Sequence, residues 1–432
     1  MNKTNTSILV AGVTIATSIM PIYANEPIEK EQTNIDVNEI VKGYFLTAKG
    51  EELVEMLLLE KQSGNIVEIV DSNVENVIKF DLVIKNNEGN IIETIGILSD
   101  NTKTLNISKE IINDKLNENV RIDLIAGDDR YKTAVEISKA TYNNPQDVNG
   151  IILIGKNAIV DGLAASPLAA QENAPILLAN KNELTQETEE EILRLLGENP
   201  NSKTIYIVGG TNTISQELEK GLNKLGVKSV ERMSGSDRYG TSLAIANKLD
   251  TSKNTENKAF VVGGNGEADA MSISAKAAEL NAPIIVTNKN KLSQDVSKFL
   301  NGKEIEIIGG NNSVSKSVEN ELVSIDNNKT IERLAGDTRK DTNTKIINKY
   351  YQEANQIFVA KEGNASLIDA LAAAPLAGRE KAPIVLSTDI LAKKQEDIIK
   401  DQLLNVKKVT QIGNGVATSV IDKIIELTGL FK

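Results

Sequence analysis

The sequence contains no histidine, no cysteine and no tryptophan. The first two absences exclude a histidine-based catalytic triad, a cysteine nucleophile, the usual zinc sites and any disulfide. Without tryptophan the chain has 8 Tyr and 6 Phe for stacking against sugars, so any sugar polymer has to be held mainly by polar and charged groups. Glycosidase chemistry, which needs only two carboxylates, stays open.

No apolar run after the first 24 residues reaches the roughly 20 residues that a membrane-spanning helix needs. The first 24 residues themselves resemble an export signal. Lys3 gives a positive start, residues 8–20 are apolar, and the small residue Ala24 precedes the polar run NEPIEKEQ. We expect cleavage after Ala24, and a secreted protein that has no membrane span after cleavage and is held at the cell surface by binding.

The remaining composition is that of a folded, soluble protein. Of the 432 residues, 40% are hydrophobic and 25% are charged, and this length suffices for about three or four domains. Acidic side chains dominate residues 1–120, whereas residues 330–432 carry a small excess of basic ones. An acidic chain without basic arrays is a poor candidate for nucleic acid. An anionic partner is expected to bind residues 330–432 or a local arginine cluster.

One stretch recurs three times. AGDDRYKTAVEISKA begins at residue 126, SGSDRYGTSLAIANK at residue 234 and AGDTRKDTNTKIINK at residue 335, so each copy starts with a Gly-x-x-Arg turn. An aspartate follows 33 or 34 residues after each glycine, and a proline follows each aspartate after a further 14 residues. Such spacing in diverged sequence indicates duplication of one folded unit. The anchor residues are Gly127, Gly235 and Gly336, then Asp161, Asp269 and Asp369, then Pro175, Pro283 and Pro383.

Each unit is predicted to be an α/β sandwich with a parallel sheet. The Gly turn and a helical stretch precede an apolar strand (IILIG, AFVVG, IFVA), a small-residue run, a second strand (APILLA, APIIVT, APIVLS), a polar helix and a third strand (IYIVGG, IEIIGG, VTQIGN). Continuous apolar strands between helices favour a sheet covered on both faces, with ligands at the carboxyl ends of the strands. The predicted domains are a signal peptide at 1–24, a small N-terminal domain at 25–119, and repeats at 121–228, 229–329 and 330–432.

The N-terminal domain does not fit the repeat. VIKFDLVIKNNEGNIIETIGIL holds two strand-like runs around NNEGN, which is a hairpin signal, and EELVEMLLLEKQ fits either a helix or a strand. We expect a small β-rich domain, and the sequence leaves its role open.

The arginines of the Gly turns have two interpretations. A planar guanidinium at the mouth of a sheet suits bidentate binding of a phosphate or carboxylate. The structural alternative, which is the commoner case, is an ion pair between each arginine and an aspartate of its own or a neighbouring unit. The turn is also expected to start a helix, with Thr133 as the cap, Glu136 at capping-box spacing, and Thr241 and Thr342 at the equivalent cap positions.

The other recurring residues favour structural roles. N-capping is the simplest role for the three anchor aspartates, and the Ala- and Ser-rich runs after them permit close helix packing. Pro167 and Pro375 indicate a helix start or a kink. The Ala-Pro-Ile runs are expected to be core strands.

The glycine pairs after the third strands predict tight turns, with phosphate binding as the alternative. They are Gly209-Gly210 and Gly309-Gly310, and the third repeat has Gly413-Asn414 in their place. Any requirement for Gly-Gly is therefore not shared by all three repeats.

The combination of GxDRY, GLAASPLAA, APILL and IYIVGG, repeated behind an export signal, resembles the type-2 cell-wall-binding repeat of clostridial and related Gram-positive surface proteins. The resemblance covers residues 121–432. It implies three units in a pseudo-threefold assembly that anchors a surface protein noncovalently to an anionic glycopolymer of the cell wall. It assigns no catalytic residue, metal or cofactor, and implies that any chain-specific activity lies outside the repeats.

By resemblance, the polymer-binding region combines the arginines of the Gly turns, their neighbours and the second strands. Two departures predict that the three sites are not equivalent. Leu124 stands where the other repeats have Arg232 and Arg333, and Lys340 stands where they have tyrosine. The implied binding residues are Arg130, Arg238, Arg339, Asp129, Asp237, Tyr131, Tyr239, Pro175, Ile176, Leu177, Leu178, Pro283, Ile284, Ile285, Val286, Pro383, Ile384, Val385 and Leu386.

Three functions stay open. The one we favour is a wall-anchored surface protein, not an enzyme, whose N-terminal domain meets a neighbouring S-layer protein or a host ligand. The second is a structural S-layer component. The third is a cell-wall hydrolase or its modifier, and a zinc-dependent amidase would lack its histidine ligands in this chain.

Overall fold

The computed structural model describes residues 6–10, 13–17, 66–71, 78–85, 91–99, 121–156, 158–363 and 367–429. The chain divides into two compact units, residues 1–124 with 429–432 and residues 125–428.

The first unit contains a five-stranded antiparallel sheet in the order β1-β2-β5-β4-β3. Strands β4 and β5 flank NNEGN and pair as a hairpin. Strands β1 and β2 lie within the predicted export signal, whose cleavage stays a prediction, and EELVEMLLLEKQ lies outside the described residues. The strands are β1 (Thr6–Val10), β2 (Val13–Thr17), β3 (Ile66–Asp71), β4 (Ile78–Lys85) and β5 (Ile91–Ser99).

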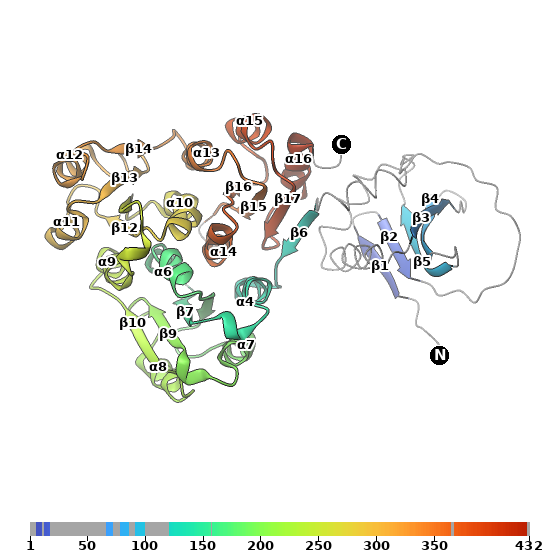
Figure 1. Cartoon of the computed structure of the whole chain (residues 1–432), viewed down its shortest axis with the longest axis horizontal. Coiled ribbons are helices and arrows are strands. Elements are labelled where there is room, and N and C mark those ends of the chain that lie inside the picture. The colour runs from blue at the N-terminus through green and yellow to red at the C-terminus, as the bar shows by residue number, and fades with distance from the viewer. Residues whose placement is uncertain are drawn as a thin grey trace, which may run out of the picture. The chain divides into compact units, whose positions relative to one another are not determined.

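Three parallel sheets of four strands make up the repeats, which confirms the predicted α/β class (Figure 1). The strand orders are β8-β7-β9-β10, β12-β11-β13-β14 and β16-β15-β17-β6. The strands are β7 (Gly150–Gly155), β8 (Ile176–Ala179), β9 (Thr204–Val208) and β10 (Ser229–Met233); β11 (Lys258–Gly263), β12 (Ile284–Thr287), β13 (Glu304–Ile308) and β14 (Glu332–Leu334); and β15 (Gln356–Lys361), β16 (Ile384–Ser387), β17 (Lys408–Ile412) and β6 (Arg121–Ile125).

The fourth strand of each sheet comes from the start of another repeat. Strand β10 begins the second repeat but pairs with β9 of the first, and β14 begins the third but pairs with β13 of the second. The third sheet ends on β6, so the chain closes into a ring. Gly413 N donates to Ile125 O at 2.9 Å across this closure. The repeats are therefore interlocked, which their sequence boundaries do not reveal.

Helices follow the strands at four equivalent positions in each repeat. Pro167 lies in the first turn of its helix and Pro375 lies inside its helix, so the two prolines have different roles. The first helices are α4 (Arg130–Thr141), α9 (Arg238–Lys248) and α13 (Arg339–Tyr350); the central ones are α5 (Ile159–Gly162) with α6 (Ala165–Gln171), α10 (Glu267–Leu280) and α14 (Leu367–Arg379); the outer ones are α7 (Gln186–Leu196), α8 (Gln216–Asn223), α11 (Gln294–Leu300), α12 (Lys316–Ile325), α15 (Lys393–Gln402) and α16 (Thr418–Thr428).

The central helices α6, α10 and α14 pack against one another in the middle of the repeats (Figure 1). A methyl group on Gly378 of α14 would lie 2.7 Å from Ala275 O of α10. Ser166 of α6 donates a hydrogen bond to Ser274 O of α10 at 3.0 Å, and both residues are buried. The small residues thus allow the close approach that the Ala-rich runs predicted, and they produce the pseudo-threefold arrangement.

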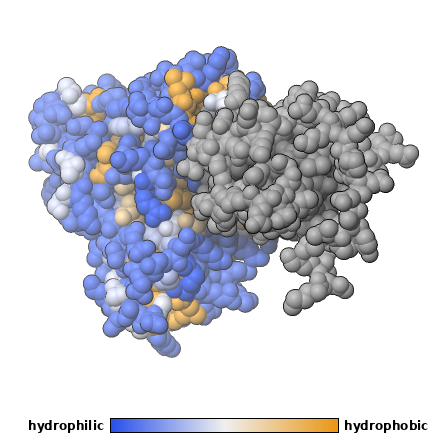
Figure 2. Space-filling view, turned by 45° about the vertical axis from the view of Figure 1, so that its right-hand side comes forward, coloured by the Kyte–Doolittle hydropathy of each residue, from blue (hydrophilic) through white to orange (hydrophobic). Residues whose placement is uncertain are grey.

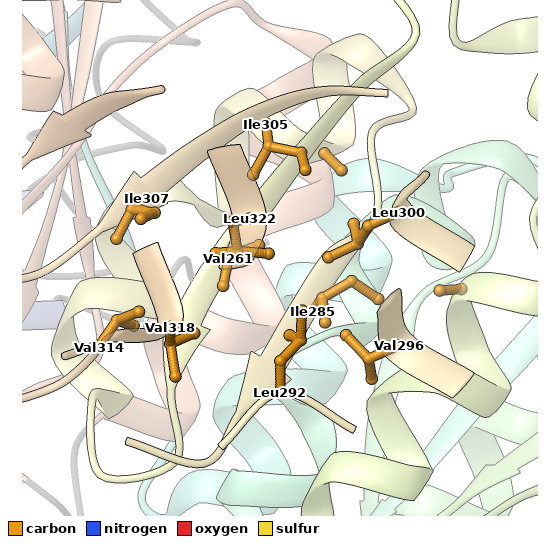
Figure 3. Close-up of a cluster of buried hydrophobic side chains, with 12 residues drawn as sticks. Val261, Ile285, Leu292, Val296, Leu300, Ile305, Ile307, Val314, Val318 and Leu322 are labelled. Carbon is orange, nitrogen blue, oxygen red and sulfur yellow. The ribbon is translucent and has the colours of Figure 1, made fainter. Parts of the chain in front are cut away.

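Each sheet is buried between its central helix and its outer helices. In the second repeat, apolar side chains of the sheet face those of α11 and α12 (Figure 3). They are Val261, Ile285, Ile305 and Ile307 of the sheet, Val296 and Leu300 of α11, and Val318 and Leu322 of α12. Complete burial of one such side chain stabilises the fold by about 1.5–3 kcal/mol. This apolar layer therefore fixes the sheet, and with it the positions of the loops at the strand ends.

The glycine of each Gly-x-x-Arg turn lies against the helix that follows it. Gly127 N donates to Thr133 Oγ1 at 3.1 Å, and the other two repeats have the same bond. An added Cβ at any of the three glycines would lie 2.1–2.3 Å from an atom of the helix. Only glycine fits there, so the anchor glycines are retained for close packing.

Replacing Gly235 with alanine is expected to lower the free energy of unfolding by about 2–3 kcal/mol, because the new Cβ would lie 2.3 Å from a main-chain carbon of Gly240. Urea unfolding of the full chain measures this change. Gly310→Ala is the matched control, since no atom lies within 4 Å of its added Cβ. Equal losses for the two variants would contradict this explanation of the turn.

Candidate functional site

Two of the Gly-turn arginines are held at the carboxyl end of a strand. Arg130 Nη1 donates to Lys156 O, just beyond β7, at 3.2 Å. Arg238 Nη1 donates to Gly264 O, just beyond β11, in the same way. Each of these arginines begins the first helix of its repeat, so its guanidinium is anchored by its own sheet.

Arg339 is the most open of the three arginines. Its side chain is 52% exposed, and its nearest partner is Glu362 Oε1, just beyond β15, at 3.9 Å. A guanidinium carries five N–H donors. Among the described residues, one hydrogen bond or one loose ion pair is all that each of the three arginines makes. Most of their donors are therefore left for a ligand.

An aspartate of the preceding repeat lies close enough to each arginine for the two charges to interact. The structural alternative expected an ion pair with an aspartate of the same or a neighbouring unit, and the facing aspartate belongs to a neighbouring unit. This alternative is wrong about the contact, because within the described part of the chain no ion pair of 4.0 Å or less joins these side chains. The pairs are Asp161 with Arg238, Asp269 with Arg339, and Asp369 with Arg130.

Burial raises the pKa of all three aspartates, to about 6 for Asp269 and for Asp369. The facing arginines lower each pKa but do not offset the burial. Asp369 Oδ1 is buried and has no hydrogen-bond partner among the described residues. The expected N-capping role is wrong, because each aspartate lies within the first turn of its helix and not before it.

The aspartates lie at the topological switch points of the sheets. In each repeat the second strand pairs with one side of the first strand, and the third strand pairs with the other side. The connections therefore diverge between β7 and β9, between β11 and β13, and between β15 and β17. Parallel sheets usually bind ligands in this crevice.

The first glycine after each third strand makes room for the aspartate. Gly209, Gly309 and Gly413 have φ angles of 103°, 109° and 74°, and an added Cβ would lie 2.5–3.0 Å from the Oδ2 atom of the aspartate in the same repeat. At Gly210 and Gly310 an added Cβ would meet nothing within 4 Å. The second glycine is thus dispensable, and this explains why the third repeat keeps Gly413 but has asparagine next.

We call each set of aspartate, following glycine and facing arginine a junction. Junction 1–2 is Asp161, Gly209 and Arg238; junction 2–3 is Asp269, Gly309 and Arg339; and junction 3–1 is Asp369, Gly413 and Arg130.

The residue before each arginine caps the first helix. Asp129 accepts hydrogen bonds from two main-chain N–H groups of α4, and Asp237 accepts one from Gly240 N. Thr338 forms a capping box with Asp341 in the third repeat. The caps expected at Thr133 and its counterparts are therefore wrong, since those residues lie inside the helix. Asp129 and Asp237 repel anions, and their observed role is to fix the helix start that carries the arginine.

The residue after each arginine ties the helix to a neighbouring loop. Tyr131 Oη donates to Asn180 Oδ1 at 2.6 Å, and Lys340 Nζ donates to Thr388 Oγ1 at 2.6 Å at the equivalent place. The ring of Tyr239 lies against the main chain at Gly264, where an added Cβ would lie 2.7 Å from it. Lys340 thus replaces a neutral hydroxyl with a cation at junction 2–3.

The second strands are core and not binding surface. Pro175, Pro283 and Pro383 and the residues after them are buried, as expected of core strands. The resemblance also implied these runs as polymer contacts, and this is corrected because their side chains do not reach the surface. The buried residues are Ile176, Leu177, Leu178, Ile284, Ile285, Val286, Ile384, Val385 and Leu386.

Arg232 and Arg333, the arginines at the position equivalent to Leu124, have a structural role, and we call them clamps. Arg232 donates to Gly209 O at 2.8 Å and pairs with Glu219 at 2.8 Å. Arg333 makes the same contacts with Gly309 O and Glu319. These arginines hold the glycine of a junction in place. The side chain of Leu124 has no N–H group, and at junction 3–1 Gln411 Nε2 donates to Gly413 O at 2.9 Å.

The fold and the junctions define a class: a ring of three interlocked α/β repeats that presents one arginine at each boundary. Comparison with known families agrees. The family described as "Cell wall binding domain 2 (CWB2)" matches residues 125–219, 232–319 and 333–422. The chain belongs to this family, and it is a cell-wall protein of the cell surface.

Solved structures and curated relatives extend this similarity. Cwp8 from Clostridium difficile is 46% identical, with a TM-score of 0.77 over 92% of this chain and 68% of that one. Cwp6 from the same organism is 27% identical, with a TM-score of 0.64 over 83% and 58%. "N-acetylmuramoyl-L-alanine amidase LytC" of Bacillus subtilis (strain 168) is 29% identical over 299 residues, 68% of this chain and 56% of the relative. "Amidase enhancer" of the same strain is 32% identical over 287 residues, 66% and 37%. The chain thus spans about half or less of these curated relatives.

No helix among the described residues is long and apolar enough to cross a membrane. No group of three or more acidic side chains in the same residues is arranged to hold a metal ion.

The junction aspartates predict a pH dependence of stability. Because burial raises the folded-state pKa of Asp369 above its ordinary value, its carboxyl group favours folding at low pH, and that contribution is lost as the pH rises through about 6. Between pH 7.5 and pH 5, the unfolding free energy of the wild type should rise by about 1 kcal/mol relative to Asp369→Asn. Urea unfolding at both pH values measures the difference. An Asp369→Asn variant that keeps the wild-type pH dependence would contradict the assignment.

Proposed function

We propose that the repeats hold this protein to the cell wall by binding an anionic secondary wall polymer at the three junctions. The observation that carries the proposal is the placement of Arg130, Arg238 and Arg339. Each lies between the carboxyl ends of two neighbouring sheets, and most of its N–H donors have no partner among the described residues. Guanidinium groups of this kind suit phosphate or carboxylate groups.

The ring allows three weak arginine–anion contacts to act together, which raises the overall affinity for the polymer. A single exposed arginine and one anionic group attract each other weakly in water. Three arginines on one rigid scaffold can engage successive charges of a repeating polymer, which raises the overall affinity by about 10²- to 10⁴-fold. The interlocked sheets and the packed central helices supply the required rigidity.

The surface composition supports polar binding of the polymer. The described face in Figure 2 is mostly hydrophilic, with small separate hydrophobic areas. Among the described residues, the exposed large hydrophobic side chains are Leu193 of α7 and Ile390 and Leu404, which lie in the loops before and after α15. No broad apolar platform for a sugar ring competes with the junctions within this part of the molecule.

The finer assignments belong to the same proposal. We propose a non-enzymatic role, supported by a sequence without histidine or cysteine. The predicted division into a signal peptide, an N-terminal domain and three repeats is kept, and the N-terminal domain is proposed to meet an S-layer neighbour or a host ligand. The amidase and amidase-enhancer relatives favour a second candidate, a modifier of wall hydrolysis.

Co-sedimentation of the full chain with protein-stripped walls tests the proposal. Binding should be saturable, weaken with rising salt, and be lost from walls whose anionic polymers have been removed by mild acid. Binding that survives both acid extraction and high salt would contradict it.

Substitution of the arginines identifies the site. Each of Arg130→Gln, Arg238→Gln and Arg339→Gln should lower wall affinity by about 3- to 10-fold, and the triple variant should not sediment with walls. Lys298→Gln is the matched control, because it removes one positive charge from an exposed position on α11. If the control loses as much affinity as the arginine variants, general charge and not the junctions explains binding.

A further inference from the structure

The junctions place a negative group beside each arginine that is proposed to bind an anion. The helix of each junction aspartate packs against the helix that its arginine begins: α5 against α9, α10 against α13 and α14 against α4. The two charges interact, but no direct ion pair of 4.0 Å or less joins them among the described residues. An anion that binds the guanidinium must therefore approach a carboxyl group as well. The two negative groups repel each other while the carboxyl group is ionised.

The repulsion is poorly screened at this place. The carboxyl group lies against a glycine turn, within 2.5–3.0 Å of where a Cβ would be, and each of the three aspartates is half-buried. The Oδ1 atom of Asp369 is fully buried. Electrostatic interactions are stronger in such surroundings than at an open surface. The charge state of the aspartate is therefore felt at the arginine.

We propose that Asp161, Asp269 and Asp369 set the affinity of the junctions for anions: each ionised carboxyl group repels the anion that its arginine attracts, and proton uptake removes the repulsion. The inference rests on the proposed function and deepens it. By thermodynamic linkage, an anion that binds must in turn promote proton uptake by the aspartate.

Charged and polar groups of the described residues act on each aspartate. Near junction 2–3 lies the Glu362 carboxyl group, whose Oε1 is 3.9 Å from Arg339 Nη1. Asp269 is faced by Arg339 and the Thr342 hydroxyl of α13 and by Glu267 of its own helix. Asp369 is faced by Arg130 of α4. Asp161 is faced by Arg238 and Thr241 of α9. The raised pKa values of Asp269 and Asp369, about 6 each, place their ionisation near neutral pH.

The test compares the full-length wild type with the double variant Asp269→Asn/Asp369→Asn on protein-stripped walls between pH 7.5 and pH 5.5. Wild-type affinity should rise by about 3- to 10-fold as the pH falls. The double variant should bind at pH 7.5 as tightly as the wild type does at pH 5.5, with little further change. Titration of the walls themselves is common to both proteins, so the difference between them reports the aspartates.

Asp295→Asn is the control, because it removes one negative charge from an exposed position on α11. It should follow the wild type at every pH. A double variant with the same pH profile as the wild type, or weaker than it throughout, overturns the inference. Loss of polymer dependence in the wild type would instead overturn the proposed function, so the two failures are distinguishable.

A second measurement needs no variant. Calorimetric titration of the wild type with the acid-extracted wall polymer at pH 6.5, in two buffers of different ionisation enthalpy, counts the protons exchanged on binding. Net proton uptake is expected. No uptake, or proton release, overturns the inference even if the variants do not fold.

Discussion

The packing of α6, α10 and α14 on one another is the contact on which the rest of the repeat region depends. It requires small residues, because a single methyl group at Gly378 would already collide with α10. It also fixes the three sheets around one axis and so brings the carboxyl end of each sheet to the start of the next repeat. The Ala-rich composition of the central helices and the location of the junctions have the same cause.

The junctions combine features that do not favour stability. A carboxyl group lies half-buried beside a glycine with a positive φ angle, and the facing arginine lies beyond ion-pair distance. A direct ion pair or an apolar pair would be the more stable choice at such a boundary. Residues arranged against stability are commonly kept for function. The proposed use of the arginine for an external anion explains why the aspartate does not neutralise it by direct contact.

Much of the fold follows from the sequence because its signals are local and repeated three times. The apolar strands, the small-residue helices and the fixed spacing predicted parallel α/β units. The exchange of the fourth strand was not predicted, because the start of a repeat such as Ser229–Met233 looks the same whichever sheet it joins. The caps were misplaced at Thr133 because its hydroxyl bonds to a glycine of the turn and not to the helix start.

The sequence predicted the three arginines as site residues, but not the aspartates and glycines that surround them. Asp161 and Arg238 lie in different repeats, and no spacing rule tells which copy faces which. The second strands, such as Ile176–Ala179, were proposed as contacts from resemblance alone, and burial removes them. One sequence signal for the aspartate sites was available. The first residue after the third strand is glycine in every repeat, whereas the second is not, and Gly413 lies against Asp369.

The central claim is that three particular arginines contact the wall polymer. Nuclear magnetic resonance of the arginine Nε–H groups in the full chain, titrated with acid-extracted polymer, tests it most directly because the chain has few arginines. We expect the signals of Arg130, Arg238 and Arg339 to shift together as polymer is added, while those of the clamps Arg232 and Arg333 stay in place. Shifts confined to the clamps, or no shift at the three junction arginines while polymer binds, would contradict it.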